Sequence, residues 1–104
     1  MGTVRFIMSV EERYKKKLIS IISKHLPQAK IYLYGSRARE DSRQGSDIDL
    51  AVDAGEKINW GILCKITSEI DDSTIPFFVD VSDLYNVSED FKKTIAKDFV
   101  AWKE

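Results

Sequence analysis

The sequence predicts an α/β fold of the α+β kind, in which a mixed sheet of three or slightly more strands is flanked by helices. Three runs have the length and the β-branched or aromatic content of strands: 31–34, 47–52 and 77–81. The predicted order is helix, strand, short helix, strand, helix, strand, helix. With 104 residues, 43% of them hydrophobic, the chain is expected to form one domain, 1–104, around a single core.

The first two long helices are predicted from apolar residues at helical spacing and from their end signals. The first begins at a Ser9 cap, with Glu12 three residues later, and stops at Pro27. Its inward-facing residues are Tyr14, Leu18, Ile21, Ile22 and either His25 or Leu26. A second helix, from Ile58 to about Ile70, joins the second and third strands, and such a crossover sets those two strands parallel.

The last helix is predicted to begin at a Ser88 cap. Its apolar stripe is formed by Phe91, Ile95, Phe99 and Trp102. Trp60 and Trp102 lie near predicted helix ends, where an exposed aromatic ring would suit an interface, and at least one of them is expected to pack in the core. The lysines at 15–17 and 92–93 are interpreted as solvated helix faces.

Two carboxylates are predicted to share one face of the second strand. Asp47 and Asp49 flank Ile48, and side chains in a strand alternate between faces. Carboxylates this close repel each other, and oxygen-only ligands favour a hard cation such as Mg²⁺. An acid-x-acid pattern by itself is more often the polar side of an exposed strand. The preceding strand and the Gly-Ser pair, with ten residues between Ser36 and Asp47, favour a metal and phosphate site instead.

A third acid is expected from the third strand, where Asp80 is a lone charge among apolar residues. An outward position on an edge strand is the alternative explanation. Asp53 and Asp83 are competing acids, ranked lower because each lies where its strand gives way to a loop. The interpretation requires Asp80 to face the same side as Asp47 and Asp49, within about 10 Å of them, so that all three reach a shared pair of ions.

The Gly-Ser turn is predicted to bind phosphate groups. Gly35 permits close approach of the backbone, and Ser36 at the start of a short helix presents its hydroxyl and nearby N–H groups to an anion. Arg37 and Arg39 follow; each either reaches a phosphate or pairs with a neighbouring acid. Ser46 is expected to close the loop and to set the approach to Asp47.

These motifs resemble the signature of the minimal nucleotidyltransferases, the small branch of the DNA polymerase β-type superfamily. The resemblance rests on the segment 35–39, the ten residues before Asp47, and the segment 46–50. It extends to the later strand at 79–81 and to the helix opening after Ser88. Glu40 departs from the pattern, because many relatives have a glycine there. The departure affects the expected shape of the loop and leaves the expected metal ligands unchanged.

The resemblance implies a polymerase β-type fold and two divalent metal ions, Mg²⁺ with Mn²⁺ as the alternative, held by Asp47, Asp49 and Asp80. It implies transfer of a nucleoside monophosphate, AMP from ATP, to a hydroxyl group with release of pyrophosphate, and Asp80 is the candidate general base. It further implies a HEPN-type helical partner protein, whose tyrosine is adenylylated so that the chain acts as an antitoxin. Two alternatives stay open: a non-catalytic antitoxin that masks its partner, and transfer to a small molecule.

Composition narrows the function classes. A net charge of −1, from 16 basic and 17 acidic residues, argues against a general nucleic-acid binder. Cys64 is the only cysteine, expected to be a buried small hydrophobe, and it suits a reducing cytoplasm. The sequence shows neither a signal-peptide pattern nor a membrane-spanning stretch, so a cytoplasmic protein is expected. The sequence leaves four questions open: which nucleotide base is preferred, what the acceptor is, whether the chain forms a homo- or hetero-oligomer, and whether it starts at Met1 or Met8.

Overall fold

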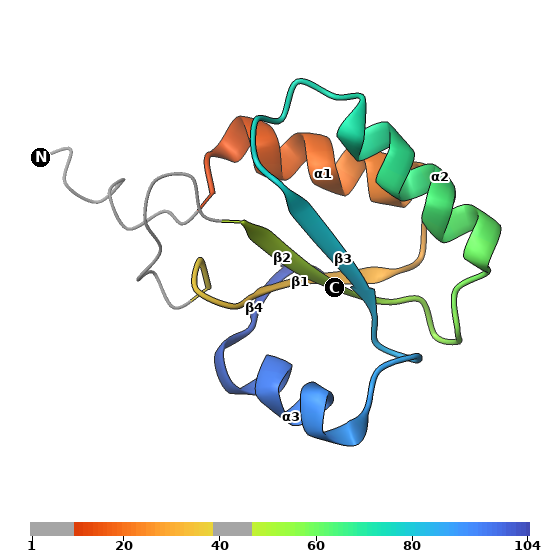
Figure 1. Cartoon of the computed structure of the whole chain (residues 1–104), viewed down its shortest axis with the longest axis vertical. Coiled ribbons are helices and arrows are strands. Elements are labelled where there is room, and N and C mark those ends of the chain that lie inside the picture. The colour runs from red at the N-terminus through yellow and green to blue at the C-terminus, as the bar shows by residue number, and fades with distance from the viewer. Residues whose placement is uncertain (1–9, 39–46) are drawn as a thin grey trace, which may run out of the picture.

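The computed structural model describes residues 10–38 and 47–104 and shows a four-stranded sheet with helices on both faces (Figure 1). The elements in chain order are α1 (Glu12–His25), β1 (Lys30–Tyr34), β2 (Ile48–Asp53), α2 (Trp60–Asp71), β3 (Val79–Asp83), α3 (Glu89–Asp98) and β4 (Val100–Lys103). The strands lie in the order β3-β2-β1-β4, with β1 antiparallel to β2 and β4, and β2 parallel to β3. The predicted mixed sheet and its parallel strand pair are therefore confirmed.

The two faces of the sheet have different partners. On one face, α1 and α2 cover the alternating apolar residues of β2, among them Ile48, Leu50 and Val52, which are fully buried (Figure 1). On the other face α3 forms a smaller core, in which Ile95 packs with Tyr34 and Ala51. This second face also carries Asp49 by alternation, so the candidate site and α3 lie on the same side of the sheet.

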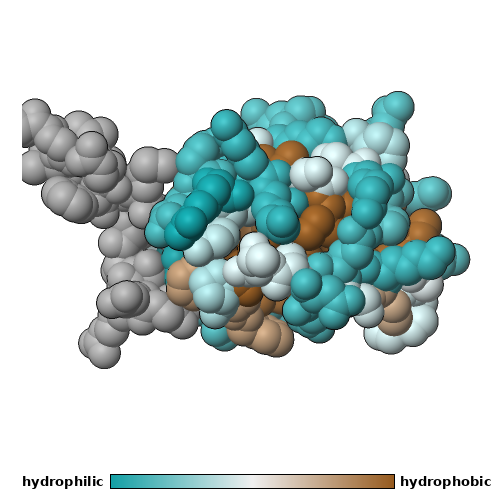
Figure 2. Space-filling model, turned by 90° about the horizontal axis from the view of Figure 1, so that it is seen from above, coloured by the Kyte–Doolittle hydropathy of each residue, from teal (hydrophilic) through white to brown (hydrophobic). Residues whose placement is uncertain are grey.

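The first two helices match their predictions apart from their starts. Ser9 lies outside the described residues; α1 begins after Glu11, whose side chain makes no capping hydrogen bond. The start of α2 is two residues later than Ile58, because the Asn59 side chain accepts hydrogen bonds from the N–H groups of Gly61 and Ile62. Viewed from the side of α1 and α2, the surface is mostly hydrophilic (Figure 2). Lys16 and Lys17 of α1 are exposed, as expected for a solvated helix face, and Lys15 is half-buried.

The last helix is shorter than predicted, and a fourth strand follows it. Ser88 caps α3 as expected, accepting a hydrogen bond from Phe91 N–H at 3.1 Å. The helix ends at Asp98, and Phe99 is already extended. Trp102 lies in β4, paired with β1, and packs against the larger core. The predicted helical stripe was wrong beyond Ile95, because the free edge of β1 offers hydrogen bonds that helical spacing cannot reveal.

Cys64 is exposed, so its predicted burial was wrong. It lies two residues from the buried Ile66, about 200° around the helix, and thus on the outer side of α2. Trp60 is 74% exposed, whereas Trp102 packs inward. The short helix expected after Ser36 begins as a turn at 35–38 and otherwise falls outside the described residues. None of the described helices is long and apolar enough to span a membrane.

Asp83 is a buried acid with a structural role. It is 6% exposed at the end of β3. Its carboxylate accepts hydrogen bonds from the N–H groups of Ile58 at 2.8 Å and Tyr85 at 2.9 Å. The side chain therefore ties the segment before α2 to the turn after β3.

We predict that Asp83→Ala lowers the free energy of unfolding by about 2–4 kcal/mol, because two backbone N–H groups lose their acceptor. Urea unfolding monitored by circular dichroism measures the change. Asp71→Ala, which removes an exposed acid at the end of α2, serves as the control and should change stability by less than about 0.5 kcal/mol. Equal effects of the two substitutions would contradict the structural role of Asp83.

Candidate active site

Two of the predicted acids are neighbours on adjacent strands. Asp49 of β2 pairs in register with Asp80 of β3 and, on its other side, with Tyr34 of β1. Adjacent strands lie about 4.8 Å apart, and register partners point to the same face. Asp80 therefore faces the same side as Asp49 and lies well within the 10 Å that a shared ion site requires. Asp47 stands directly before β2 and is exposed.

The three acids, Asp47, Asp49 and Asp80, interact electrostatically. The pKa of Asp49 is raised, first because partial burial disfavours its charged form, then by repulsion from Asp80 and from Asp47. A nearby divalent cation would reverse this effect, since it stabilises the ionised carboxylates. The local charge arrangement thus favours an added cation.

The donor set fits a hard divalent ion, because all three side chains offer carboxylate oxygens. Within residues 10–38 and 47–104, however, no three acidic, histidine or cysteine side chains are already drawn together closely enough to hold a metal ion. The backbone places Asp49 and Asp80 side by side, and rotation of the carboxylates would bring their oxygens inward. Asp47, Asp49 and Asp80 are the residues that would hold the metal.

The turn that contains Gly35 presses directly on this acid row. Gly35 has a φ of +79°, and a Cβ atom at this position would lie only 2.5 Å from Oδ2 of Asp49. A side chain here is therefore disfavoured by the left-handed backbone, and the Asp49 carboxylate would have to move to admit it. Ser36 follows in the half-buried turn, which is closed by a 3.1 Å hydrogen bond from Ala38 N–H to the Gly35 carbonyl. The predicted phosphate turn and the acids are thus in contact.

Arg37 is held inside the protein. It is 7% exposed, and its guanidinium lies 4.6 Å from the ring centre of Phe77, just before β3. Burial lowers its pKa, and the negative charge of Asp47 opposes this shift. The side chain therefore links the Gly-Ser turn to the segment that leads to Asp80. The predicted phosphate contacts Arg39 and Ser46 lie outside the described residues.

Tyr34 is a residue of this site that the sequence interpretation missed. Its hydroxyl is 3.3 Å from Oγ of Ser82, and its ring meets Phe91 of α3 edge-on, with ring centres 5.8 Å apart. Burial raises the pKa of Tyr34, and the charges of Asp49 and Asp80 raise it further. Tyr34 forms the wall between the acid row and α3. Its position directly before Gly35 was the available signal.

The competing residues do not join the acid row. Asp53 lies four residues beyond Asp49 on β2, about 13 Å away, and Asp83 is buried on the opposite face. His25 pairs with Glu69, which joins α1 to α2, as expected for a packing residue.

Comparison with known proteins agrees with this geometry. Residues 16–100 match the family model described as polymerase beta, nucleotidyltransferase. A probable protein adenylyltransferase MntA of Haemophilus influenzae is 28% identical over 85 residues, which are 82% of this chain and 75% of that protein. A crystal structure of a toxin–antitoxin with AMP-PNP matches with a TM-score of 0.66 and 26% identity, covering 85% of this chain and 71% of the other.

A further structural neighbour is a tri-AMPylated HEPN toxin in complex with an MNT antitoxin from Shewanella oneidensis. Its TM-score is 0.63 at 23% identity, with 89% of this chain and 71% of the other covered. At that identity the likeness concerns the fold.

We predict that Gly35→Ala lowers the free energy of unfolding by about 2–4 kcal/mol, because backbone strain adds to a clash with Asp49. Gly55→Ala is the matched control: its φ is +82°, but no atom lies within 4 Å of the added Cβ, so only about 1 kcal/mol of backbone strain is expected. In an Asp49→Ala background the cost of Gly35→Ala should fall toward the control value. Equal costs for both glycines in the wild type would refute the clash.

The raised pKa of Asp49 predicts a pH-dependent effect of Asp49→Asn. The native state keeps a proton on Asp49 to a higher pH than the unfolded state, whose ordinary pKa is 3.8. The stability that Asp49 contributes is therefore present at low pH and lost as the pH rises through the folded pKa. Without divalent ions, Asp49→Asn should be more stable than the wild type at neutral pH.

The difference between Asp49→Asn and the wild type should disappear below about pH 4, where Asp49 is protonated in both states. Urea unfolding at several pH values measures it, with Asp71→Asn as the control for removal of an exposed acid. A stability gap that widens toward low pH would show that the sign is wrong.

Proposed function

The chain belongs to the polymerase beta nucleotidyltransferase family, and from this we propose that it transfers AMP from ATP to a hydroxyl group with release of pyrophosphate. The observation that carries the proposal is the in-register pair of Asp49 and Asp80 beside the Gly35 turn. Enzymes of this kind are metal-dependent, and we propose two Mg²⁺ ions, with Mn²⁺ as the alternative. When bound, such ions activate the attacking hydroxyl and neutralise phosphate charge.

Each residue of the site has a proposed role. Gly35 and Ser36 bind the β- and γ-phosphates through the turn, with Arg39 and Ser46 as further phosphate and loop contacts. Asp47, Asp49 and Asp80 hold the ions. Arg37 is a positioning residue rather than a phosphate ligand, because its guanidinium is buried against Phe77.

The reaction that these residues support is an in-line attack on the α-phosphorus. The acceptor oxygen forms a bond to that phosphorus, the bond to the β-phosphate oxygen breaks, and pyrophosphate leaves. Asp80 accepts the proton of the hydroxyl. It is an exposed acid of the row and lies on the edge strand β3, where an incoming acceptor arrives first. Positioning and charge neutralisation provide most of the acceleration.

We propose that the acceptor is a tyrosine of a HEPN-type helical partner, so that the chain acts as an antitoxin. The similarity to a probable protein adenylyltransferase and to a toxin–antitoxin structure with AMP-PNP supports this choice. The exposed position of Asp80 supports it too, because a whole protein can approach an edge strand. The reaction would take place in the cytoplasm, where ATP is available and the exposed Cys64 stays reduced.

We predict that Asp49→Asn and Asp80→Asn each lower AMP transfer at least about a hundredfold, because each removes a metal ligand. The assay incubates the chain with ATP labelled at the α-phosphate, Mg²⁺ and the protein encoded by the neighbouring gene, and follows label on that protein. Asp71→Asn, an exposed acid outside the site, is the control and should retain full activity.

Two outcomes would contradict the proposal. Full activity of Asp49→Asn would remove that carboxylate from the reaction. Tight binding of the neighbouring protein without any label would show that the chain masks its partner by contact instead of modifying it.

A further inference from the structure

Phe78 is a large aromatic residue that lies directly before the edge strand β3. Its side chain is 63% exposed, and among the described residues it belongs to neither of the two hydrophobic clusters. Its backbone is nevertheless held by the sheet, because its carbonyl accepts a hydrogen bond from Ile48 N–H at 2.9 Å. This bond continues the parallel ladder that pairs β2 with β3. The residue therefore has a fixed place on the surface without contributing to the core.

Alternation along the chain places the Phe78 ring on the same face of the sheet as the acid row. Phe77 and Val79, the residues on either side of it, pack with the larger core under α1 and α2. Phe78 therefore points to the opposite face, together with Asp80, whose Cα atom lies about 7 Å along the strand. The register of β2 with β3 also sets Phe78 beside Asp47. The ring thus borders the acids on the side of β3.

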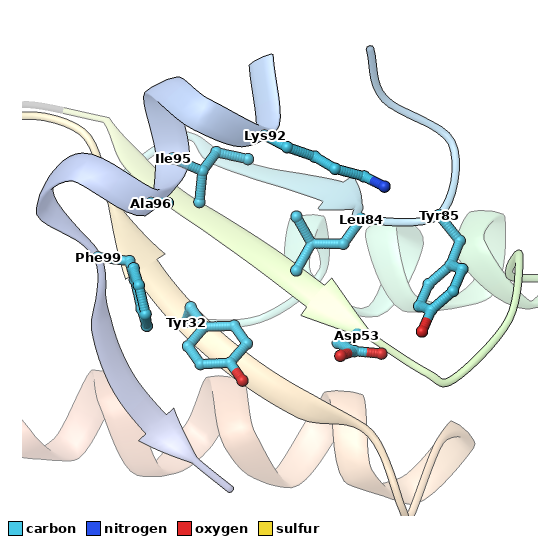
Figure 3. Close-up of a pocket in the computed structure, with 8 residues that line it drawn as sticks. All are labelled: Tyr32, Asp53, Leu84, Tyr85, Lys92, Ile95, Ala96 and Phe99. Carbon is cyan, nitrogen blue, oxygen red and sulfur yellow. The ribbon is translucent and has the colours of Figure 1, made fainter. Parts of the chain in front are cut away.

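The other exposed aromatic rings of the described residues lie away from the acids. Tyr85 and Phe99 line a cavity of about 330 Å³ around Asp53, about 13 Å from the acid row at the far end of β2 (Figure 3). Trp60 begins α2, which covers the opposite face of the sheet. Phe78 is therefore the exposed ring that a reactant bound at the acids would meet.

In-line displacement would bring the acceptor to the β3 side of the acids. The Gly-Ser turn follows β1, and β1 and β3 lie on opposite sides of β2. With the β- and γ-phosphates on that turn, as proposed above, pyrophosphate leaves on the β1 side. The entering oxygen approaches the phosphorus from the side opposite the leaving oxygen. The acceptor therefore arrives over β3, where Asp80 and Phe78 lie.

We propose that Phe78 binds the aromatic ring of the acceptor, so that the site selects a phenolic hydroxyl, as on a tyrosine side chain, over an aliphatic hydroxyl. This inference rests on the proposed nucleotidyl transfer and names the acceptor class for it. A phenylalanine side chain has no hydrogen-bonding group, so its exposed ring recognises another ring by offset or edge-on packing, with ring centres about 4.5–7 Å apart.

The geometry and the charge of the site both suit a phenol. The hydroxyl lies at the far end of a tyrosine ring, so a ring packed on Phe78 can present its oxygen to Asp80, about 7 Å away along the strand. A neutral phenol also brings no further negative charge to three neighbouring carboxylates. A serine side chain or a sugar has no ring that Phe78 could hold.

The first test measures AMP transfer to the protein encoded by the neighbouring gene. Phe78→Ala should raise the KM for that protein at least about tenfold, while the KM for ATP stays within about twofold. Phe78→Leu keeps an apolar side chain but loses the ring, so it should raise the same KM about threefold or more. Phe78→Tyr keeps the ring and should restore the KM to within about twofold of the wild type.

Trp60→Ala is the matched control for these variants. It removes an aromatic ring that is 74% exposed and lies outside the site, so it should leave both KM values unchanged. Because Phe78 is also largely exposed, its variants should keep the circular dichroism spectrum of the wild type.

A second test uses neither ATP nor metal. p-Benzoyl-phenylalanine replaces Phe78, and the chain is irradiated in a mixture with the same neighbouring protein. Mass spectrometry identifies the cross-linked peptide, which we expect to contain the tyrosine that receives AMP in the transfer assay. The same photoreactive residue in place of Trp60 should give no cross-link to that peptide.

Four results would overturn the proposal: an unchanged acceptor KM in Phe78→Ala, label on serine or threonine instead of tyrosine, no cross-link to a tyrosine-bearing peptide, or a rise in the KM for ATP alone. The last result would identify Phe78 as a contact of the nucleobase. If the wild-type chain transfers no AMP, the proposed function fails, and the cross-link alone then decides whether Phe78 receives a tyrosine ring.

Discussion

The parallel pairing of β2 with β3 is the constraint on which the site depends, because it sets Asp49 beside Asp80. Burial raises the pKa of Asp49, and repulsion between the two neighbouring carboxylates raises it further. The fold tolerates this because the opposite face of β2 is apolar, with Ile48 and Leu50 fully buried under α1 and α2. Burial on one face thus stabilises an arrangement that is electrostatically unfavourable on the other.

The Gly-Ser turn adds a second condition to the same place. Gly35 has a φ of +79°, and a Cβ atom there would displace the Asp49 carboxylate, so glycine allows the turn to lie directly against the acid. Arg37, stacked on Phe77, then fastens the turn to the chain that enters β3. A phosphate on the turn would consequently lie next to the acids without any large movement of the backbone. Preorganisation of this kind reduces the cost of binding a charged nucleotide.

Local patterns in the sequence predicted the strands, the parallel pair and the position of Asp80, because alternation and a crossover helix leave few arrangements open. They failed where distant pairing decides the structure. Phe99 and Trp102 continue a helical spacing, yet β4 forms because β1 has a free edge. Cys64 has the residue type of a core position but falls on the outer side of α2. Tyr34 was interpreted only as part of a strand, since its contact with Ser82 joins residues 48 positions apart.

The position of α3 divides one face of the sheet between the acid row and the cavity that Asp53 lines. Ile95 of α3 packs on Tyr34 and on Ala51, which lies between Asp49 and Asp53 along β2. Asp49 lies at one end and Asp53 at the other, about 13 Å apart, which is less than the width of an ordinary protein interface. A partner protein with an interface of ordinary size that brings an acceptor hydroxyl to Asp80 would therefore also cover the far end of β2, so contacts that recognise the partner can lie away from the acids.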